Sequence, residues 1–175
     1  MGYIENIDIE ILNLIKTYFQ SPIFDHIFLY FTRIGDKGAV WISIAIVLLF
    51  KKENRKKGAM VLLVLLLGFL LGELILKPLI GRARPFIKYE EFTTIIEVNT
   101  RNSFPSGHTT SSFAAAGILF NRLEKFNWGF FVLAGGIAFS RLYYFLHYPS
   151  DIVGGIGLGL FCAWLVLKFE KINIY

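Results

Sequence analysis

Six apolar segments, separated by short polar stretches, constrain the fold of this chain more than any other feature of its sequence. A helix that crosses a bilayer needs about 20 mostly apolar residues, at about 1.5 Å of rise per residue. The clearest candidate is 58–76, in which Glu73 is the only charged residue. The six segments are 23–34, 38–50, 58–76, 109–120, 126–146 and 152–167. We therefore expect an all-α polytopic membrane protein with six transmembrane helices, in which 1–175 form a single transmembrane domain.

The N-terminal segments carry a weaker pattern. The segments 23–34 and 38–50 are short for a full crossing, so they would extend into flanking residues, lie in a thinned bilayer or be partly interfacial. Before them, 4–16 alternates Ile and Leu with charged residues at helical spacing, which indicates an amphipathic helix on the membrane surface. The alternative that this stretch lengthens the first spanning helix stays open. No secretory signal is recognisable, so we expect the N-terminus to be retained.

Composition supports a membrane protein and excludes several other classes. Hydrophobic residues make up 55% of the 175 residues, and the mean hydropathy of +0.56 excludes a disordered tail. Cys162 is the only cysteine, which excludes an intramolecular disulfide and a multi-cysteine metal site. The net charge of +5 comes from short basic clusters between apolar segments and not from a continuous stripe, so we expect no nucleic-acid partner.

Basic clusters also predict how the chain is oriented. The five cations in 51–57 place that loop in the cytoplasm by the positive-inside rule. With six crossings, the loop with Arg122 and Lys125 and the tail with Lys168 and Lys171 fall on the same side, so we expect both termini in the cytoplasm. The opposite side also carries cations, for which we expect another role: Arg82, Arg84, Lys88 and Arg101.

Three groups of polar residues lie where membrane helices would end. They follow the third apolar segment, open the fourth, and span the junction of the fifth and sixth. The groups are Lys77 with Arg84-Pro85, then Pro105-Ser106-Gly107-His108, and then Ser140-Arg141, His147 and Asp151. These helix ends all lie at one face of the membrane, so we expect the three groups to meet. Charged residues at such depth are costly and mark functional sites.

The cations of the first and third groups, together with the second group, predict a site for phosphoryl oxygens. Lys77, Arg84 and Arg141 would bring three cations together, and these repel one another unless a multiply charged anion such as phosphate neutralises them. The amides around Ser106 and Gly107, at the start of a helix, would add N–H donors and the positive end of a helix dipole.

The histidines predict nucleophilic catalysis. His147 precedes Asp151 by four residues, so one helical turn would let the carboxylate hold one ring N–H and leave the other nitrogen as a nucleophile. His108 could protonate the leaving oxygen and later deprotonate the water that hydrolyses a phosphohistidine. Asp151 is the only carboxylate of the three groups, too few for magnesium, and the neighbouring cations argue against zinc. We therefore expect neither a metal nor another cofactor.

The spacing of these residues resembles a known signature. The first part is Lys77, six residues and Arg84-Pro85, the second is 105–108, and the third is Ser140-Arg141, five residues, His147, three residues and Asp151. Together these parts are similar to the three-part motif of the type 2 phosphatidic acid phosphatase superfamily. The resemblance implies a six-helix membrane phosphatase that acts on lipid phosphates or pyrophosphates without a metal. It implies that His147 is the nucleophile, Asp151 its partner and His108 the acid. It implies phosphate binding by Lys77, Arg84, Ser106, Gly107 and Arg141.

The expected function follows from this resemblance and from the orientation. The site would face the extracytoplasmic side of the cell membrane, so we expect a lipid phosphate substrate exposed in that leaflet. Undecaprenyl pyrophosphate, which must be dephosphorylated to recycle the cell-wall carrier, is the first choice, and phosphatidylglycerol phosphate and phosphatidic acid are alternatives. A non-catalytic lipid-phosphate binder or transporter is the alternative from another class. Glu73, four residues before Lys77, is expected to pair with it, with proton transfer as the alternative. The oligomeric state stays open.

Overall fold

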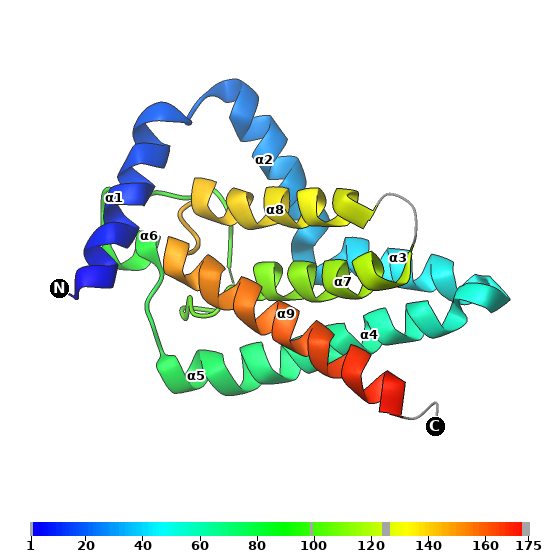
Figure 1. Cartoon of the computed structure of the whole chain (residues 1–175). Helices are drawn as coiled ribbons and strands as arrows, with labels where there is room; N and C mark the ends of the chain where they lie inside the picture. The colour runs from blue at the N-terminus through cyan, green and yellow to red at the C-terminus, as the bar shows by residue number, and fades with distance from the viewer. Residues whose placement is uncertain (1, 99, 124–126, 173–175) are drawn as a thin grey trace.

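The computed structural model describes residues 2–98, 100–123 and 127–172, and in this part of the chain the regular structure is helical apart from an isolated bridge between Ala83 and Asn102. The helices are α1 (Tyr3–Tyr18), α2 (Pro22–Gly35), η1 (Asp36–Gly38), α3 (Ala39–Phe50), η2 (Lys52–Asn54), α4 (Arg55–Phe69), η3 (Leu70–Leu76), α5 (Lys77–Ile80), α6 (Pro85–Lys88), α7 (Gly107–Arg122), α8 (Asn127–Tyr143) and α9 (Pro149–Ile172). The expectation of an all-α fold is confirmed (Figure 1).

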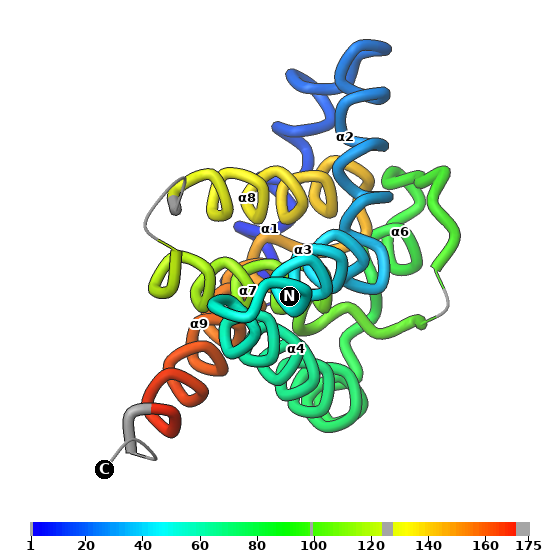
Figure 2. The backbone as a smooth tube through the Cα atoms, turned by 90° about the vertical axis from the view of Figure 1, so that its right-hand side faces the viewer, coloured from blue at the N-terminus to red at the C-terminus, as the bar shows by residue number. Residues whose placement is uncertain are grey.

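Helix α7 lies at the centre of the bundle, between α8 on one side and α4 and α9 on the other (Figure 2). Its three alanines, 114–116, are fully buried. Gly159 of α9 packs directly against the α7 backbone, since a Cβ at this position would lie 2.6 Å from the carbonyl oxygen of Thr110. Small residues on both helices therefore allow the close approach that helices need where lipid supplies no hydrophobic driving force.

Helices α4, η3 and α5 form one continuous rod that carries Lys77 near its end. The sequence predicted its apolar part, 58–76, and the rod extends beyond this part in both directions. Its middle element, η3, is a π-helix that contains Glu73, and such irregular turns are frequent at functional sites. Gly81 ends the rod in the left-handed conformation, with φ +62°, which glycine adopts without strain.

Helix α8 ends at Tyr143, three residues before the end that the apolar pattern 126–146 predicts. Phe126, the predicted first residue, lies outside the described residues. A turn in which Phe145 has φ 54° closes the helix, and α9 begins with proline, whose missing N–H costs nothing at a first helical position. His147 therefore lies in irregular backbone between two helices.

Helices α3, α7, α8 and α9 and the α4–α5 rod run along the length of the bundle (Figure 1). Helix α2, the expected first crossing, does not. Near its start Asp25 accepts a hydrogen bond from Tyr143, and just beyond its end Asp36 contacts His108, and both partners lie at the same end of the bundle.

The two termini of the described chain lie at opposite ends of the bundle (Figure 1). Helix α1 is separated from α2 by 19–21, so it does not lengthen that helix, and its Asp8 accepts a hydrogen bond from the Ser150 amide at the start of α9. At the far end of α9, Glu170 pairs with Lys56 beside the basic loop. This arrangement differs from the expectation that both termini share one side, which assumed that α2 runs the length of the bundle. A membrane-surface location for α1 stays a prediction.

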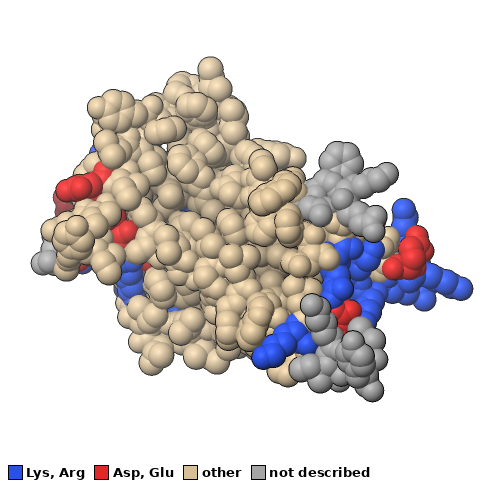
Figure 3. All heavy atoms as spheres, viewed as in Figure 1, with Lys and Arg blue, Asp and Glu red and all other residues tan. Residues whose placement is uncertain are grey.

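An apolar belt separates the two charged ends. Figure 3 shows Lys, Arg, Asp and Glu gathered at the ends of the visible face, with none between them. Large apolar side chains are exposed around the bundle, including Leu63, Val132 and Trp164, which lipid favours and water does not. Of the described helices, Lys52–Ile80 and Pro149–Glu170 are long and apolar enough to cross a bilayer, and Trp128–Tyr143 is a shorter apolar helix. Lys125 and the side chain of Lys171, two of the cations used for orientation, lie outside the described residues.

Candidate active site

The three polar groups predicted from the sequence meet where α5 and α8 end and α7 and α9 begin (Figure 1). They adjoin a cavity of about 710 Å³. Ser106 and Asp151 lie behind its wall, and both are fully buried. The other six of the eight predicted site residues form part of the wall itself: Lys77, Arg84, Gly107, His108, Arg141 and His147.

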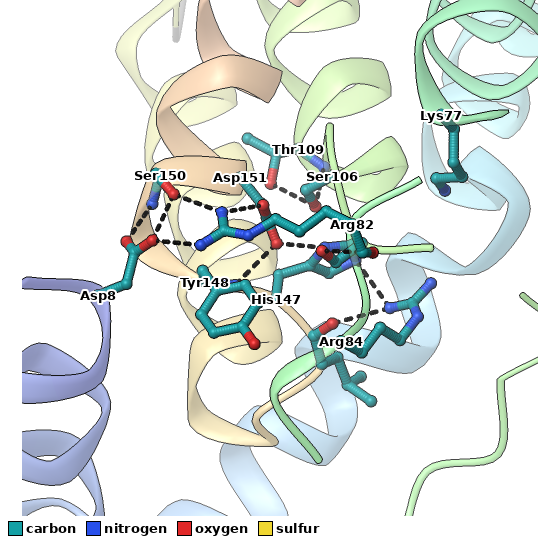
Figure 4. A network of polar contacts seen from close by, with 12 residues as sticks. Asp8, Lys77, Arg82, Arg84, Ser106, Thr109, His147, Tyr148, Ser150 and Asp151 are labelled. Atoms are coloured by element: carbon teal, nitrogen blue, oxygen red, sulfur yellow. Dashed lines mark hydrogen bonds and ion pairs between the residues drawn. The ribbon is translucent and has the colours of Figure 1, made fainter. Parts of the chain in front are cut away.

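The imidazole of His147 is buried against the cations of this cavity (Figure 4). Its Nε2 lies 3.2 Å from Nη1 of Arg84. Arginine has no acceptor, so Nε2 presents its lone pair and Nδ1 carries the proton of the neutral ring. Burial, followed by the charges of Arg84, Arg141 and Lys77, holds the pKa of His147 well below its ordinary value. The ring is therefore neutral near pH 7, with a nitrogen lone pair at the cavity.

Asp151 lies behind His147, in the first turn of α9. Its Oδ2 is 3.5 Å from Nδ1 of His147, longer than a hydrogen bond, and accepts the backbone N–H of Tyr148 at 2.9 Å. Its Oδ1 accepts a hydrogen bond from Nη1 of Arg82 at 2.8 Å. A carboxylate on the proton-bearing side of an imidazole favours this tautomer and stabilises positive charge that develops on the ring.

The two buried arginines of the cavity are held in different ways. Arg84 donates to the backbone carbonyl oxygens of Thr100 and Leu146, both at 2.8 Å. Arg141 donates to the hydroxyl of Thr32, and among the described residues its Nε has no hydrogen-bond partner. A buried guanidinium with an unused N–H is costly unless a ligand completes its hydrogen bonds. The cavity therefore suits an anion.

Lys77 forms the ion pair with Glu73 that their spacing predicts, with Nζ 2.5 Å from Oε1. The same carboxylate lies against the first residue of α7, in the space that a Cβ would need at Gly107. The N-terminus of a helix carries partial positive charge. The carboxylate of Glu73 thus lies between a cation and the positive end of a helix, which is a favourable position for any anion.

His108 has a partner that the sequence did not indicate. Its Nε2 lies 2.9 Å from Oδ1 of Asp36, in η1. This hydrogen bond holds the pKa of Asp36 below its ordinary value, so the carboxylate is ionised. Its charge favours a protonated His108 ring, whereas burial of the ring and the charge of Arg141 oppose it. The only sequence signal is the Gly-Asp-Lys-Gly break at 35–38 between two apolar segments, a turn pattern that names no partner.

Ser106 is placed to cap α7. Its Oγ accepts hydrogen bonds from the amide and the hydroxyl of Thr109, at 3.4 and 2.9 Å, so the side chain is engaged in the first helical turn. Its own amide donates to the backbone carbonyl of Asp151 at 3.2 Å. Ser106 therefore joins α7 to α9 behind the cavity, whereas its neighbour Gly107 lies on the wall.

A second polar cluster, formed by Asp8, Arg82 and Ser150, adjoins Asp151 (Figure 4). On sequence grounds Arg82 is one of several cations near the third segment, and Asp8 belongs to an amphipathic helix. No local pattern joins residues 74 positions apart, so this cluster required the structure. Among the described residues, no group of three or more His, Cys, Asp or Glu side chains is placed to hold a metal ion.

Comparison with known proteins covers the whole of this site. A family model described as "PAP2 superfamily" matches 57–175. The chain is 28% identical over 166 residues to an undecaprenyl-diphosphatase of Sulfolobus acidocaldarius, which covers 94% of this chain and 79% of that protein. It is 35% identical over 97 residues to a lipid A 4'-phosphatase of Bacteroides thetaiotaomicron, which covers 51% of this chain and 43% of that protein.

Two solved structures share the fold. Aquifex aeolicus LpxE superposes with a TM-score of 0.81 at 29% identity, covering 93% of this chain and 95% of that one. A transmembrane PAP2 type phosphatidylglycerolphosphate phosphatase from Bacillus subtilis superposes with a TM-score of 0.77 at 24% identity, covering 98% and 88%. The second likeness shows the fold alone, which is that of a transmembrane protein.

Proposed function

This chain belongs to the PAP2 superfamily and is a membrane lipid phosphatase, and we propose that it hydrolyses undecaprenyl diphosphate to undecaprenyl phosphate and inorganic phosphate. The observation that carries the proposal is the Nε2 lone pair of His147 in a cavity walled by Lys77, Arg84 and Arg141. A binder or transporter of lipid phosphates would need the cations but no nucleophile. The choice of substrate is supported by the Sulfolobus relative, which matches 94% of the chain.

In the first proposed step, Nε2 of His147 attacks the terminal phosphorus of the substrate. A P–N bond forms, the bond from phosphorus to the bridging oxygen breaks, and undecaprenyl phosphate leaves. His108 donates a proton to the leaving oxygen, and the neighbouring charge of Asp36 favours the protonated ring that this requires. Asp151 stabilises the positive charge that develops on His147.

In the second proposed step, water hydrolyses the phosphohistidine. His108, now neutral, takes a proton from the water as its oxygen attacks phosphorus. The P–N bond breaks, inorganic phosphate leaves, and both rings return to their starting protonation states. Lys77, Arg84 and Arg141 neutralise the phosphoryl oxygens in both transition states, the type of electrostatic stabilisation that contributes most in a buried site.

Helices α3 and α4 give the cavity an apolar side that suits a prenyl tail. This side is formed by Ile42, Leu62, Leu65, Leu66 and Phe69. Leu66 and Phe69 are also 54% and 51% exposed, so the apolar wall continues to the outer surface of the bundle. A prenyl chain could therefore enter sideways from the lipid while its diphosphate reaches His147.

The basic loop supports a placement in the membrane. The cations of 51–57 and the Glu170–Lys56 pair lie at the end of the bundle opposite the cavity. The positive-inside rule puts that end in the cytoplasm and the site on the extracytoplasmic side of the cell membrane. In this arrangement 1–175 form one transmembrane domain with five crossings, and α1 and α2 lie at the outer face, α1 as an interfacial helix.

A substrate panel tests the proposed activity. Phosphate release by the purified protein in detergent would be compared for undecaprenyl diphosphate, phosphatidylglycerol phosphate, phosphatidic acid and lipid A. We expect the highest kcat/KM for undecaprenyl diphosphate, and a higher value for another lipid would reassign the substrate. No release from any of them, with undecaprenyl phosphate still bound, would favour the non-catalytic binder.

The His147→Ala variant tests the nucleophile. It should lose turnover and still bind undecaprenyl phosphate, because the cations of the cavity remain. Full activity in this variant would refute the proposed mechanism.

A further inference from the structure

The N-terminal helix α1 buries a carboxylate next to the candidate active site. Asp8 is 2% exposed and lies on the same helical face as the buried Leu12 and Ile15. An ionised carboxylate so deeply buried is costly unless its oxygens are bonded. Asp8 accepts from the amide and the hydroxyl of Ser150 at 2.8 and 2.6 Å, and from Nη2 of Arg82 at 2.6 Å. Its burial is therefore explained by these two partners.

Arg82 joins this carboxylate to that of Asp151 (Figure 4). While Nη2 binds Asp8, Nη1 donates to Oδ1 of Asp151 at 2.8 Å and to Oγ of Ser150 at 2.6 Å. The guanidinium carbon lies 3.8 Å from the centre of the Tyr148 ring. A planar group that is bonded along two edges and stacked on one face has a single favourable orientation.

The consequence is the orientation of the Asp151 carboxylate. The last torsion of an aspartate side chain is broad, so this group turns easily when it is not bonded. Arg82 holds Oδ1, and the Tyr148 amide holds Oδ2, 3.5 Å from Nδ1 of His147. Asp8, Arg82 and Ser150 are not part of the described cavity wall, so they are not placed to bind the phosphate.

We propose that Arg82 and Asp8 are positioning residues: Asp8 of α1 fixes Arg82, and Arg82 fixes the Asp151 carboxylate against His147. The inference rests on the proposed function, because it takes His147 as the nucleophile and Asp151 as its partner. It makes α1 a part of the catalytic apparatus, in addition to any contact that this helix makes with a membrane surface.

The test compares variants of the full chain, purified in detergent, with undecaprenyl diphosphate as substrate. Arg82→Gln should lower kcat with little change in KM, by about 10- to 100-fold if the loss matches that seen when the outer partner of a metal ligand is removed. Asp8→Asn should lower kcat by a smaller factor. The double variant should be no worse than Arg82→Gln alone, because both residues act through one contact with Asp151.

Glu5→Gln is the matched control. Glu5 makes another charged contact between α1 and this region, with Lys88 and Tyr89, and that contact does not lead to Asp151. Its loss should leave kcat unchanged. Leu12→Ala is a second control, because it weakens the packing of α1 without removing a charge.

Two further readouts separate positioning from a structural role. Nitrogen NMR of labelled histidine should show less of the Nδ1–H tautomer of His147 in Arg82→Gln, but not in Leu12→Ala at the same thermal stability. Arg82→Lys keeps the charge without the planar fork and should restore part of kcat. If Arg82→Gln does not fold, Asp8→Asn and Arg82→Lys decide the question.

Unchanged kcat in Arg82→Gln would overturn the inference. If that variant does not fold, unchanged kcat in Asp8→Asn and Arg82→Lys would overturn it. An effect confined to KM would also overturn it, because Arg82 would then bind substrate directly. Equal losses of kcat in Leu12→Ala would assign a structural role instead. Turnover by His147→Ala would refute the proposed function itself, whereas an inactive His147→Ala beside a fully active Arg82→Gln would refute only the positioning role.

Discussion

Replacing Asp36 by Asn tests whether His108 is the acid of the first step. Oδ1 of Asp36 lies 2.9 Å from Nε2 of His108, and the Asp36 side chain is 57% exposed. The amide of Asn has nearly the same shape and still offers an oxygen acceptor, but it lacks the charge that favours a protonated ring. Any change in the pH dependence of turnover therefore reports the loss of that charge.

The magnitude follows from the geometry. A hydrogen bond to a charged group contributes about 1.5 to 3 kcal/mol, and exposure of more than half the Asp36 side chain reduces this to about 1 kcal/mol. One pH unit corresponds to about 1.4 kcal/mol, so the effect is about 0.7 unit. Because the carboxylate favours the protonated acid, its loss moves the basic limb of the kcat–pH profile to lower pH. On that limb kcat should fall about fivefold.

The assay is phosphate release at saturating undecaprenyl diphosphate, measured from acid to alkaline pH, so that kcat is followed without KM. Glu97→Gln is the control, because it removes another carboxylate from the cavity wall at a different position. The limb should move less in this control than in Asp36→Asn. An unmoved limb in Asp36→Asn, or a move to higher pH, would refute the role of Asp36 and His108 as a coupled acid.

Three more predictions follow from other parts of the structure. Glu73→Gln removes the carboxylate that lies 2.5 Å from Lys77, so inorganic phosphate should inhibit turnover more strongly. An unchanged Ki for phosphate would show that Lys77 does not contact the phosphate. Gly159→Val forces a side chain against α7, where Cβ alone would lie 2.6 Å from the Thr110 oxygen, and should destabilise the protein by about 2 kcal/mol, seen as a lower Tm. Gly157→Val, whose Cβ would have no neighbour within 4 Å, is its control, and equal losses of Tm would contradict the packing argument. The topology is tested with single cysteines in a Cys162→Ala background. Cysteines at the exposed positions Glu10 and Thr93 should react with an impermeant thiol reagent in intact cells, and a cysteine at the exposed position Lys52 should react only after permeabilisation. The opposite pattern would reverse the proposed topology.

The cavity residues were predictable because they contrast with their surroundings. Lys77, Arg84, Arg141 and His147 are polar or charged groups at the borders of apolar segments, where lipid makes each of them costly. Counting crossings from the third segment onward placed these borders at one face, and the structure has them around one cavity. The prediction therefore needed only the ends of the helices and not their packing.

The partners of these residues could not be predicted in the same way. Asp36 lies 72 positions from His108, and Asp8 lies 74 positions from Arg82. Each pair depends on how α1 and α2 pack onto the end of the bundle, which no local spacing specifies. A turn aspartate and one acidic residue of an amphipathic helix are also common features of solvent-facing segments.

Hydropathy could not specify the number of crossings for a related reason. An apolar segment such as 23–34 has the same composition whether it faces lipid as a crossing or packs against neighbouring helices. In the structure its aromatic residues pack on α8, with Phe28 against Phe139 and Tyr143. Hydropathy measures how favourably a segment leaves water. It does not say whether lipid or protein then surrounds the segment, so it could not separate these two outcomes.

Capture of the phosphorylated enzyme tests the nucleophile most directly. The protein would be mixed with undecaprenyl diphosphate carrying a labelled terminal phosphate and quenched in alkali, in which a P–N bond survives. Mass spectrometry of the peptides would then locate the phosphate. We predict label on His147 in the wild-type chain and none in His147→Ala. Label on a different residue, or turnover by His147→Ala, would contradict the mechanism.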